Sequence, residues 1–209
     1  MVIHIVNFPF CNFYSLERYL RVSSHAYQLL SAEDTVSISD VIVLPGVGTF
    51  EQGMEYLRAS ALTSTILKHA NAGGRVIGIC LGMQMLLNSS SESPGVEGLG
   101  LIPGVCERIP VDPSFSVPHI GWNGLVLPEV LLSTVLQPII PSHFSCSDFY
   151  FVHSYFAKPS VADATIASFE HPSGNLAAAI GLENVIGFQF HPEKSGSAGY
   201  ALLNHVLER

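Results

Sequence analysis

The chain has 209 residues and no shift in composition, so we expect one domain over residues 1–209. Hydrophobic residues make up 48% of the chain and charged residues only 12%, which favours a surface partly covered by a partner. The formal net charge of −8, without a basic cluster, argues against binding to nucleic acid.

The N-terminal half alternates apolar strands with helices. The predicted elements are, in order, a strand at 2–6, a helix at 15–30, a strand at 41–44, one or two helices at 51–72 and a strand at 76–79. Strands that alternate with helices predict a parallel sheet covered on both faces. Ligands of such a sheet bind beyond the carboxyl ends of the strands.

The C-terminal half changes to short apolar or alternating runs. These runs lie at 101–109, 119–127, 148–153, 164–170, 176–180 and 185–190. We expect them to add antiparallel strands to the sheet, after a loop at 89–95, and a helix at 198–208 to close the chain. The predicted fold class is therefore α/β, with a mixed, mostly parallel sheet and helices on both faces.

The N-terminal sequence and the pattern of cysteines indicate the cellular compartment of the protein. Residues 1–10 are apolar but lack a basic leader and a cleavage site, and no apolar run is long enough to span a bilayer. Cys11, Cys80, Cys106 and Cys146 show no metal-ligand spacing and no disulfide pattern. We expect a cytoplasmic protein without membrane contact, metal or cofactor.

Cys80 lies in the sequence Gly78-Ile79-Cys80-Leu81-Gly82, between a predicted strand and a predicted helix. Small flanking residues permit the sharp turn of a nucleophile elbow. A free cysteine beside a strand is more often a small buried hydrophobic residue, but the paired glycines favour a nucleophile. Glycines in the loop Gly46-Val47-Gly48 leave N–H groups free, so this loop is either a plain turn or, with the N–H of Leu81, an oxyanion hole.

A second candidate group follows the apolar strand that ends at residue 190. His191 stands before Pro192 and Glu193, so Glu193 can reach back to the imidazole and orient it. Most histidines at a strand end are ordinary hydrogen-bonded residues, and eight others are present. The Pro-Glu context favours His191 as the base that activates Cys80.

These residues match a family. Gly-Ile-Cys-Leu-Gly-Met-Gln at 78–84 and Phe-His-Pro-Glu-Lys-Ser at 190–195 resemble class I, triad-type glutamine amidotransferases, which have a flavodoxin-like fold. Segments 44–50, 118–123 and 149–155 resemble the glutaminase subunit of imidazole glycerol phosphate synthase, in matching order along nearly the whole chain. The resemblance implies that Cys80 forms a thioester with glutamine, with His191 as acid and base and Glu193 as its partner.

The resemblance also implies contacts with substrate and partner. The residues implied to hold L-glutamine are Gln84, Glu92, Ser154 and Tyr155. The positions implied to face a (β/α)₈ barrel synthase subunit are Asn12, Trp122, Tyr150 and Lys194. Ammonia would pass to that barrel, which makes imidazole glycerol phosphate and an aminoimidazole carboxamide ribotide in histidine biosynthesis.

One segment departs from the family. Residues 7–12 read Asn-Phe-Pro-Phe-Cys-Asn, where the family usually has Asp-Tyr-Gly-x-Gly-Asn in a turn that faces the synthase. The departure leaves open a paralogous amidotransferase that supplies ammonia for amidine formation on a surface-polysaccharide sugar. A non-catalytic regulatory module is a third reading, and the presence of Cys80, His191 and Glu193 argues against it.

Overall fold

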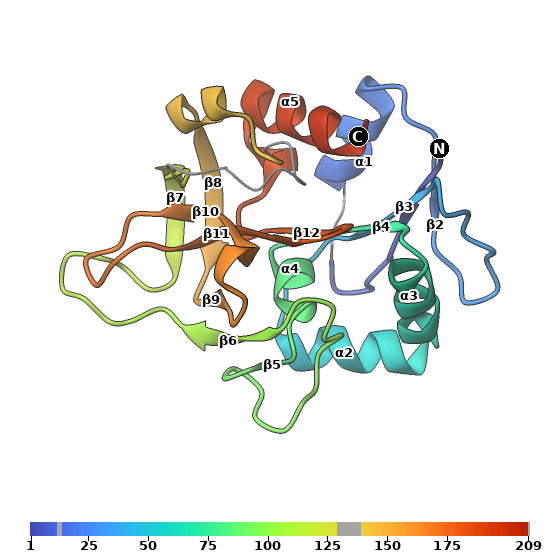
Figure 1. Cartoon of the computed structure of the whole chain (residues 1–209), viewed down its shortest axis with the longest axis horizontal. Coiled ribbons are helices and arrows are strands. Elements are labelled where there is room, and N and C mark those ends of the chain that lie inside the picture. Colours follow the sequence, from blue (N-terminus) through green and yellow to red (C-terminus); the bar gives the residue numbers. More distant parts are fainter. Residues whose placement is uncertain (12–13, 129–138, 209) are drawn as a thin grey trace.

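Short apolar runs form the parallel strands at the centre of the molecule. The computed structural model describes residues 1–11, 14–128 and 139–208. The parallel strands are β1 (Ile3–Ile5), β2 (Tyr27–Leu29), β3 (Val41–Leu44), β4 (Arg75–Ile79) and β12 (Val185–Phe188). With two antiparallel strands they make a seven-stranded sheet in the order β10-β11-β12-β4-β3-β1-β2 (Figure 1).

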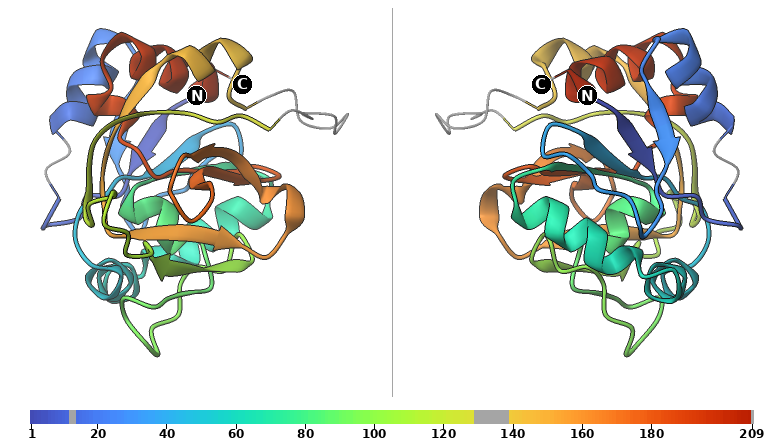
Figure 2. Two further views of the ribbon diagram at one scale, coloured as in Figure 1. Left: turned by 90° about the vertical axis from the view of Figure 1, so that its left-hand side faces the viewer. Right: turned by 90° about the vertical axis from the view of Figure 1, so that its right-hand side faces the viewer.

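Helices cover both faces of this sheet, as predicted. On one face lie α1 (Tyr14–Val22) and α5 (Gly196–Leu207), and on the other α2 (Phe50–Ala59), α3 (Leu62–Asn71) and α4 (Leu81–Met85) (Figures 1 and 2). The predicted helical stretch at 51–72 is thus two helices. The Thr49 side chain caps α2 in a capping box with Gln52. Within the described residues, no helix has the length and apolar character needed to cross a membrane.

The predicted helix at 15–30 is wrong in its second half. α1 ends at Val22, where the Ser23 hydroxyl donates to the carbonyl oxygen of Tyr19 and Ser24 adopts a φ of 59°. A residue in this left-handed region cannot continue a right-handed helix. The chain turns there, and Tyr27–Leu29 becomes the edge strand β2, parallel to β1.

The strands of the C-terminal half belong to three sheets. The prediction that these runs all add antiparallel strands to the main sheet is therefore corrected. Among the described strands, only β10 (Thr165–Phe169) and β11 (Leu176–Leu182) are antiparallel additions to the main sheet. The other strands are β5 (Ser89–Ser90), β6 (Gly104–Arg108) and β9 (Tyr155–Pro159) in one small sheet, and β7 (His119–Gly124) and β8 (Asp148–His153) in a two-stranded ribbon. Periodicity indicates a strand but not its neighbour, and neither β5 nor β9 is indicated by it. Three short 3-10 helices complete the described chain, at Ser142–Cys146, Ala162–Ala164 and Pro192–Lys194.

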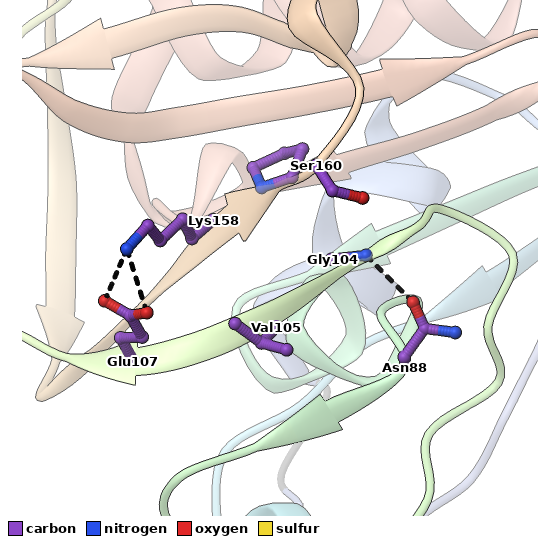
Figure 3. Close-up of a pocket in the computed structure, with 7 residues that line it drawn as sticks. Asn88, Gly104, Val105, Glu107, Lys158 and Ser160 are labelled. Atoms are coloured by element: carbon purple, nitrogen blue, oxygen red, sulfur yellow. Dashed lines mark hydrogen bonds and ion pairs between the residues drawn. The ribbon is translucent and has the colours of Figure 1, made fainter.

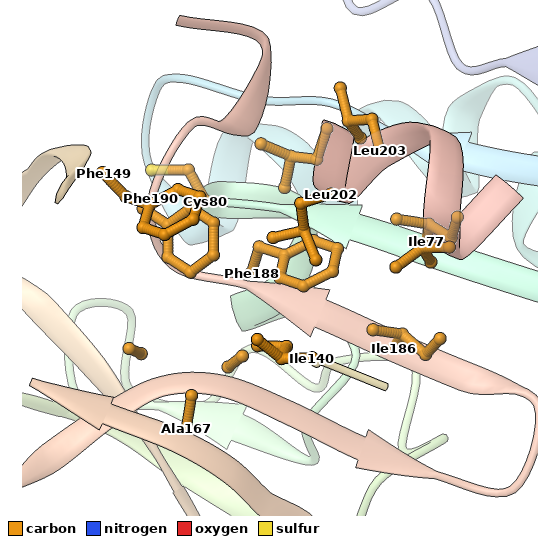
Figure 4. Packing of buried hydrophobic residues seen from close by; sticks show 14 of the residues in the cluster. Ile77, Cys80, Ile140, Phe149, Ala167, Ile186, Phe188, Phe190, Leu202 and Leu203 are labelled. Atoms are coloured by element: carbon orange, nitrogen blue, oxygen red, sulfur yellow. The ribbon is translucent and has the colours of Figure 1, made fainter. Parts of the chain in front are cut away.

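The core consists of two buried clusters, one on each side of the main sheet. Along β4, Ile77 and Ile79 belong to the cluster under α1 and α5, whereas Val76 belongs to the cluster over α2, α3 and α4. This alternation follows the two-residue period of a strand. Cys80 continues β4 and lies in the first cluster, where Figure 4 shows it near Phe149 and Phe190.

Candidate active site

Cys80 occupies a strained turn between β4 and α4. Its φ of 53° and ψ of −107° are rare for a residue with a side chain. The two flanking glycines are required sterically, because a Cβ on Gly82 would overlap the carbonyl oxygen of Leu44 and one on Gly78 would lie 2.6 Å from the Gly82 backbone. The strand, cysteine and helix therefore form the elbow that the sequence predicts.

The Cys80 side chain is buried, with 6% of the residue exposed. Its thiol donates to the carbonyl oxygen of Val152 on β8, 3.8 Å away, and accepts from Nε2 of Gln189 at 3.7 Å. Its backbone N–H donates to the carbonyl oxygen of Phe188 at 2.7 Å. These contacts fix the sulfur at one place beside the end of the sheet.

His191 and Glu193 form a buried pair behind this cysteine. Nδ1 of His191 lies 2.7 Å from Oε1 of Glu193, and Nε2, the other ring nitrogen, is buried and makes no hydrogen bond to a residue that the structure describes. Burial lowers the pKa of His191, but the Cys80 sulfur and the Glu193 carboxylate outweigh burial and raise this pKa well above its usual value. The imidazole is thus oriented by the carboxylate and favours its protonated form.

Ser195 holds His191 in place and was not singled out from the sequence. Its hydroxyl donates to the carbonyl oxygen of His191 at 2.6 Å and accepts from the backbone N–H of Tyr150 at 3.0 Å. The N–H of His191 in turn donates to the carbonyl oxygen of Tyr150 at 2.8 Å. The only sequence signal for Ser195 is its place at the end of the 190–195 motif.

A cavity of about 300 Å³ opens beside Cys80 and gathers most of the predicted site. Its lining residues are Val47, Gly48, Cys80, Leu81, Gln84, Glu92, Pro118, Val152, His153, Ser154 and Tyr155. All four residues implied to bind glutamine are present, as are three of the four oxyanion candidates. Gly46, the fourth, is buried against Leu81. The sequence did not single out Pro118, Val152 and His153.

Two of the implied glutamine contacts are already oriented. Nε2 of Gln84 donates to the carbonyl oxygen of Tyr155 at 3.0 Å and to Oε1 of Gln189 at 3.3 Å. Oε2 of Glu92 accepts the backbone N–H of Phe50, the first residue of α2, at 2.8 Å. Gln84 thus presents its amide, and Glu92 its carboxylate, from fixed positions on the cavity wall.

The described part of the altered segment, residues 7–11, lies against the loop of Gly46, Val47 and Gly48. Gly48 has a φ of 119°, and a Cβ there would come within 3.1 Å of the Phe10 ring. Burial raises the pKa of the Cys11 thiol, while a hydrogen bond from the backbone N–H of Val47 acts against this rise. Cys11 therefore lies beside the loop that the sequence assigns to the oxyanion hole.

The predicted partner face is only partly described. Trp122 on β7 is 57% exposed and contacts Tyr150 on β8 edge to face, with ring centroids 5.8 Å apart. Lys194 is exposed and directly follows Glu193. Asn12, the remaining candidate, lies outside the described residues.

A second hollow, of about 340 Å³, lies over the small sheet of β6 and β9 (Figure 3). Its polar contacts are the Lys158–Glu107 ion pair, with Nζ 3.0 Å from Oε1, and the bond from the N–H of Gly104 to Oδ1 of Asn88 at 2.8 Å. None of the predicted site residues that the structure describes lines it.

The fold, the elbow and the histidine-carboxylate pair define a class of protein. Residues 6–207 match the family described as glutamine amidotransferase class-I, so the chain belongs to that family. A solved glutamine amidotransferase is 16% identical, with a TM-score of 0.73 and 99% of both chains covered. PurLQS from Thermotoga maritima is 17% identical, with a TM-score of 0.70, covering 99% of this chain and 97% of that one. At these identities the structures support the fold alone.

Curated relatives narrow the family. The imidazole glycerol phosphate synthase subunit HisH of Methanothermobacter thermautotrophicus is 41% identical over 196 residues, which are 90% of this chain and 92% of the relative. The HisH subunits of Gloeobacter violaceus and Listeria monocytogenes are 35% and 36% identical, over 99% of this chain and 89% and 95% of theirs. The chain therefore falls within the HisH family.

Proposed function

We propose that this chain is the glutaminase subunit of an imidazole glycerol phosphate synthase, and that it hydrolyses L-glutamine to L-glutamate and ammonia. The observation that carries the proposal is a single cavity in which Cys80 meets Gln84, Glu92, Ser154 and Tyr155, with the His191–Glu193 pair behind the cysteine. The identity of 35–41% to HisH subunits supports it.

The chemistry follows from the residues around the sulfur. In the reactive pair His191 holds the proton and Cys80 is the thiolate, which attacks the side-chain amide carbon of glutamine. The N–H of Leu81, with one from the loop of Gly46, Val47 and Gly48, stabilises the tetrahedral oxyanion. His191 returns the proton to the departing nitrogen, so ammonia leaves and a γ-glutamyl thioester remains. Water, deprotonated by His191, then hydrolyses the thioester and releases glutamate.

The cavity wall supplies glutamine recognition. The Glu92 carboxylate pairs with the α-ammonium group of the substrate, and Gln84 and the backbone of Ser154 and Tyr155 hold the rest of the molecule. The substrate's ammonium group thus faces a carboxylate, and its other polar atoms face amide and main-chain groups of the protein. Few buried polar atoms are therefore left unpaired.

Ammonia must pass directly to a partner subunit. Near neutral pH free ammonia is largely protonated and no longer nucleophilic, so release into water would waste it. We propose a heterodimer with a (β/α)₈ barrel synthase that docks on Asn12, Trp122, Tyr150 and Lys194 and makes imidazole glycerol phosphate and the aminoimidazole carboxamide ribotide. The free catalytic thiol fits a reducing compartment, and we propose the cytoplasm.

The two alternatives are less well supported. A polysaccharide amidine pathway rests on the altered turn at 7–12, whereas the HisH relatives cover up to 99% of the chain and favour histidine biosynthesis. A non-catalytic module has no need of the Cys80 elbow or of the oriented His191.

The decisive experiment replaces the nucleophile. In complex with its synthase subunit, the Cys80→Ala variant should lose glutamine-dependent product formation and keep the reaction driven by added ammonium salt. Cys106→Ala, a second buried thiol, is the matched control and should keep both activities. A Cys80→Ala variant that still hydrolyses glutamine at the normal rate would overturn the proposal.

A further inference from the structure

Two buried histidines behind the glutamine cavity have no part in the mechanism above. His119 on β7 and His153 on β8 are cross-strand partners, and Nδ1 of His119 lies 3.2 Å from Nε2 of His153. Nδ1 of His153 lies 2.9 Å from the carbonyl oxygen of Tyr155. Of the two, only His153 lines the cavity.

The carbonyl oxygen of Tyr155 fixes where the protons lie. A carbonyl can only accept, so Nδ1 of His153 must carry a proton and, in the neutral ring, Nε2 must be the acceptor. Nδ1 of His119 must then donate to it. Both hydrogen bonds therefore have the same direction: His119 donates to His153, and His153 donates to the carbonyl oxygen of Tyr155.

Both rings are held neutral and in place by their surroundings. Burial lowers the pKa of His153 to about 3 and also lowers that of His119, with the charge of His171 acting in the same direction on His119. The His119 ring is stacked on Phe151 at 4.9 Å and tilted against Phe115 and Phe169 at 4.9 and 5.0 Å. An aromatic cage of this kind leaves the ring little freedom to turn.

The histidine pair ends on a group that the substrate site uses. The carbonyl oxygen of Tyr155 accepts from His153 and also from Nε2 of Gln84, at 3.0 Å. Gln84, His153 and Tyr155 all line the cavity. If the His153 proton moved to Nε2, this carbonyl would face a lone pair and the segment would shift.

We propose that His119 is a positioning residue for glutamine binding: it donates to His153, fixes that ring as its Nδ1–H tautomer, and so holds the Tyr155 carbonyl and Gln84 for the substrate. In water the other tautomer of histidine, with the proton on Nε2, is favoured, so the His119 donor adds to the selection that the Tyr155 carbonyl makes. The proposal rests on the proposed glutaminase function, because it assigns Gln84 and Tyr155 to glutamine.

The kinetic test uses the complex with the synthase subunit and L-glutamine as the probe. His119→Leu removes the donor and should raise the KM for glutamine about tenfold with little change in kcat, as expected for one lost buried hydrogen bond. His119→Asn keeps a donor at the Nδ1 position and should restore the KM to within about threefold of the parent. His171→Leu, in the same aromatic cluster, is the control and should leave the KM unchanged.

The second readout does not depend on activity or on a variant that folds. Nitrogen NMR of ¹⁵N-histidine-labelled parent protein should find two neutral rings with the proton on Nδ1, those of His119 and His153. A His153 ring protonated on Nε2, or a KM for His119→Leu that matches the His171→Leu control, would overturn the inference. An inactive parent complex would instead contradict the proposed function, while the NMR result would still decide the tautomer.

Discussion

The hollow beside Cys80, of about 300 Å³, and the hollow over β6 and β9, of about 340 Å³, are similar in volume but differ in chemistry. The first brings together a strained thiol, an amide, a carboxylate and main-chain groups from distant parts of the chain. The second is lined by an exposed ion pair, an asparagine, a serine and apolar atoms. Volume therefore does not identify the site, whereas converging reactive groups do.

The topology accounts for this difference. β3 and β4 are parallel neighbours, so the loop of Gly46 and Gly48 and the Cys80 elbow leave the sheet at the same edge. The turns at that edge present groups that the sheet does not use. β6 and β9 are antiparallel and pair residue by residue from Gly104 to Arg108, so the main-chain groups along their shared edge are used within the sheet.

The largest difference in rate between variants of the two hollows should come from replacing His191, the proposed base. His191→Ala should lower the glutamine-dependent rate about 10³-fold, because the proposed mechanism uses His191 to hold the Cys80 proton and to return it to the leaving nitrogen. The rate with ammonium salt should stay near the parent value. Lys158→Met, in the other hollow, is the control, and similar losses in both variants would abolish the distinction between them.

Glu193→Gln should cost less, about a hundredfold in kcat, because the base remains and only its orientation and charge support are reduced. The variant should also change the pH profile. Glu193 helps to raise the pKa of His191, so its neutralisation lowers that pKa, and the imidazolium loses its proton at a lower pH. The alkaline limb of kcat should move to lower pH, and a limb that stays in place would show that Glu193 does not govern this titration.

Trp122→Ala should weaken association with the synthase subunit by about 2 kcal/mol, roughly thirtyfold in Kd, if this exposed ring is an anchor of the docking face. Val111→Ala, another exposed hydrophobic residue, is the matched control. Titration calorimetry with the purified barrel subunit measures both. Equal affinities for the two variants would move the interface away from β7.

The smallest effect belongs to the second hollow. Lys158 and Glu107 are paired at 3.0 Å, but their side chains are 60% and 43% exposed. Lys158→Met should therefore change the free energy of unfolding by less than about 1 kcal/mol in urea titrations. A larger loss, or a loss of glutaminase activity, would give this hollow an unexpected role.

The sequence predicted the parts of the fold that local pattern controls. Buried runs such as Val41–Leu44 and the glycines around Cys80 are local features, and both are found as predicted. The end of α1 depends on a bond from the Ser23 hydroxyl to its own helix and on the unusual φ of Ser24, which hydrophobic periodicity does not reveal. The partners of β6 and β8 depend on contacts distant in sequence, and no period encodes them.

The site residues also fall into those that a local motif predicts and those whose role depends on distant contacts. Cys80, His191 and Gln84 stand in short motifs, and the cavity gathers Cys80 and Gln84 with His191 directly behind it. Ser195, His119 and His153 act through other residues, so their roles depend on hydrogen bonds that only the folded chain makes. The role of Cys11 was left open by the sequence, and the structure adds its position beside Val47.

Strand β8 contacts both the nucleophile and the base of the site. One edge pairs with β7, and the other edge offers the Tyr150 carbonyl to His191 and the Val152 carbonyl to Cys80, while Tyr155, just beyond it, holds Gln84. A small tilt of this ribbon would change the distances to His191 and Cys80 together, whereas Tyr155 belongs to β9 and is held by the small sheet. Nucleophile and base therefore share one degree of freedom, and a molecule that wedges the ribbon would halt turnover without entering the glutamine cavity.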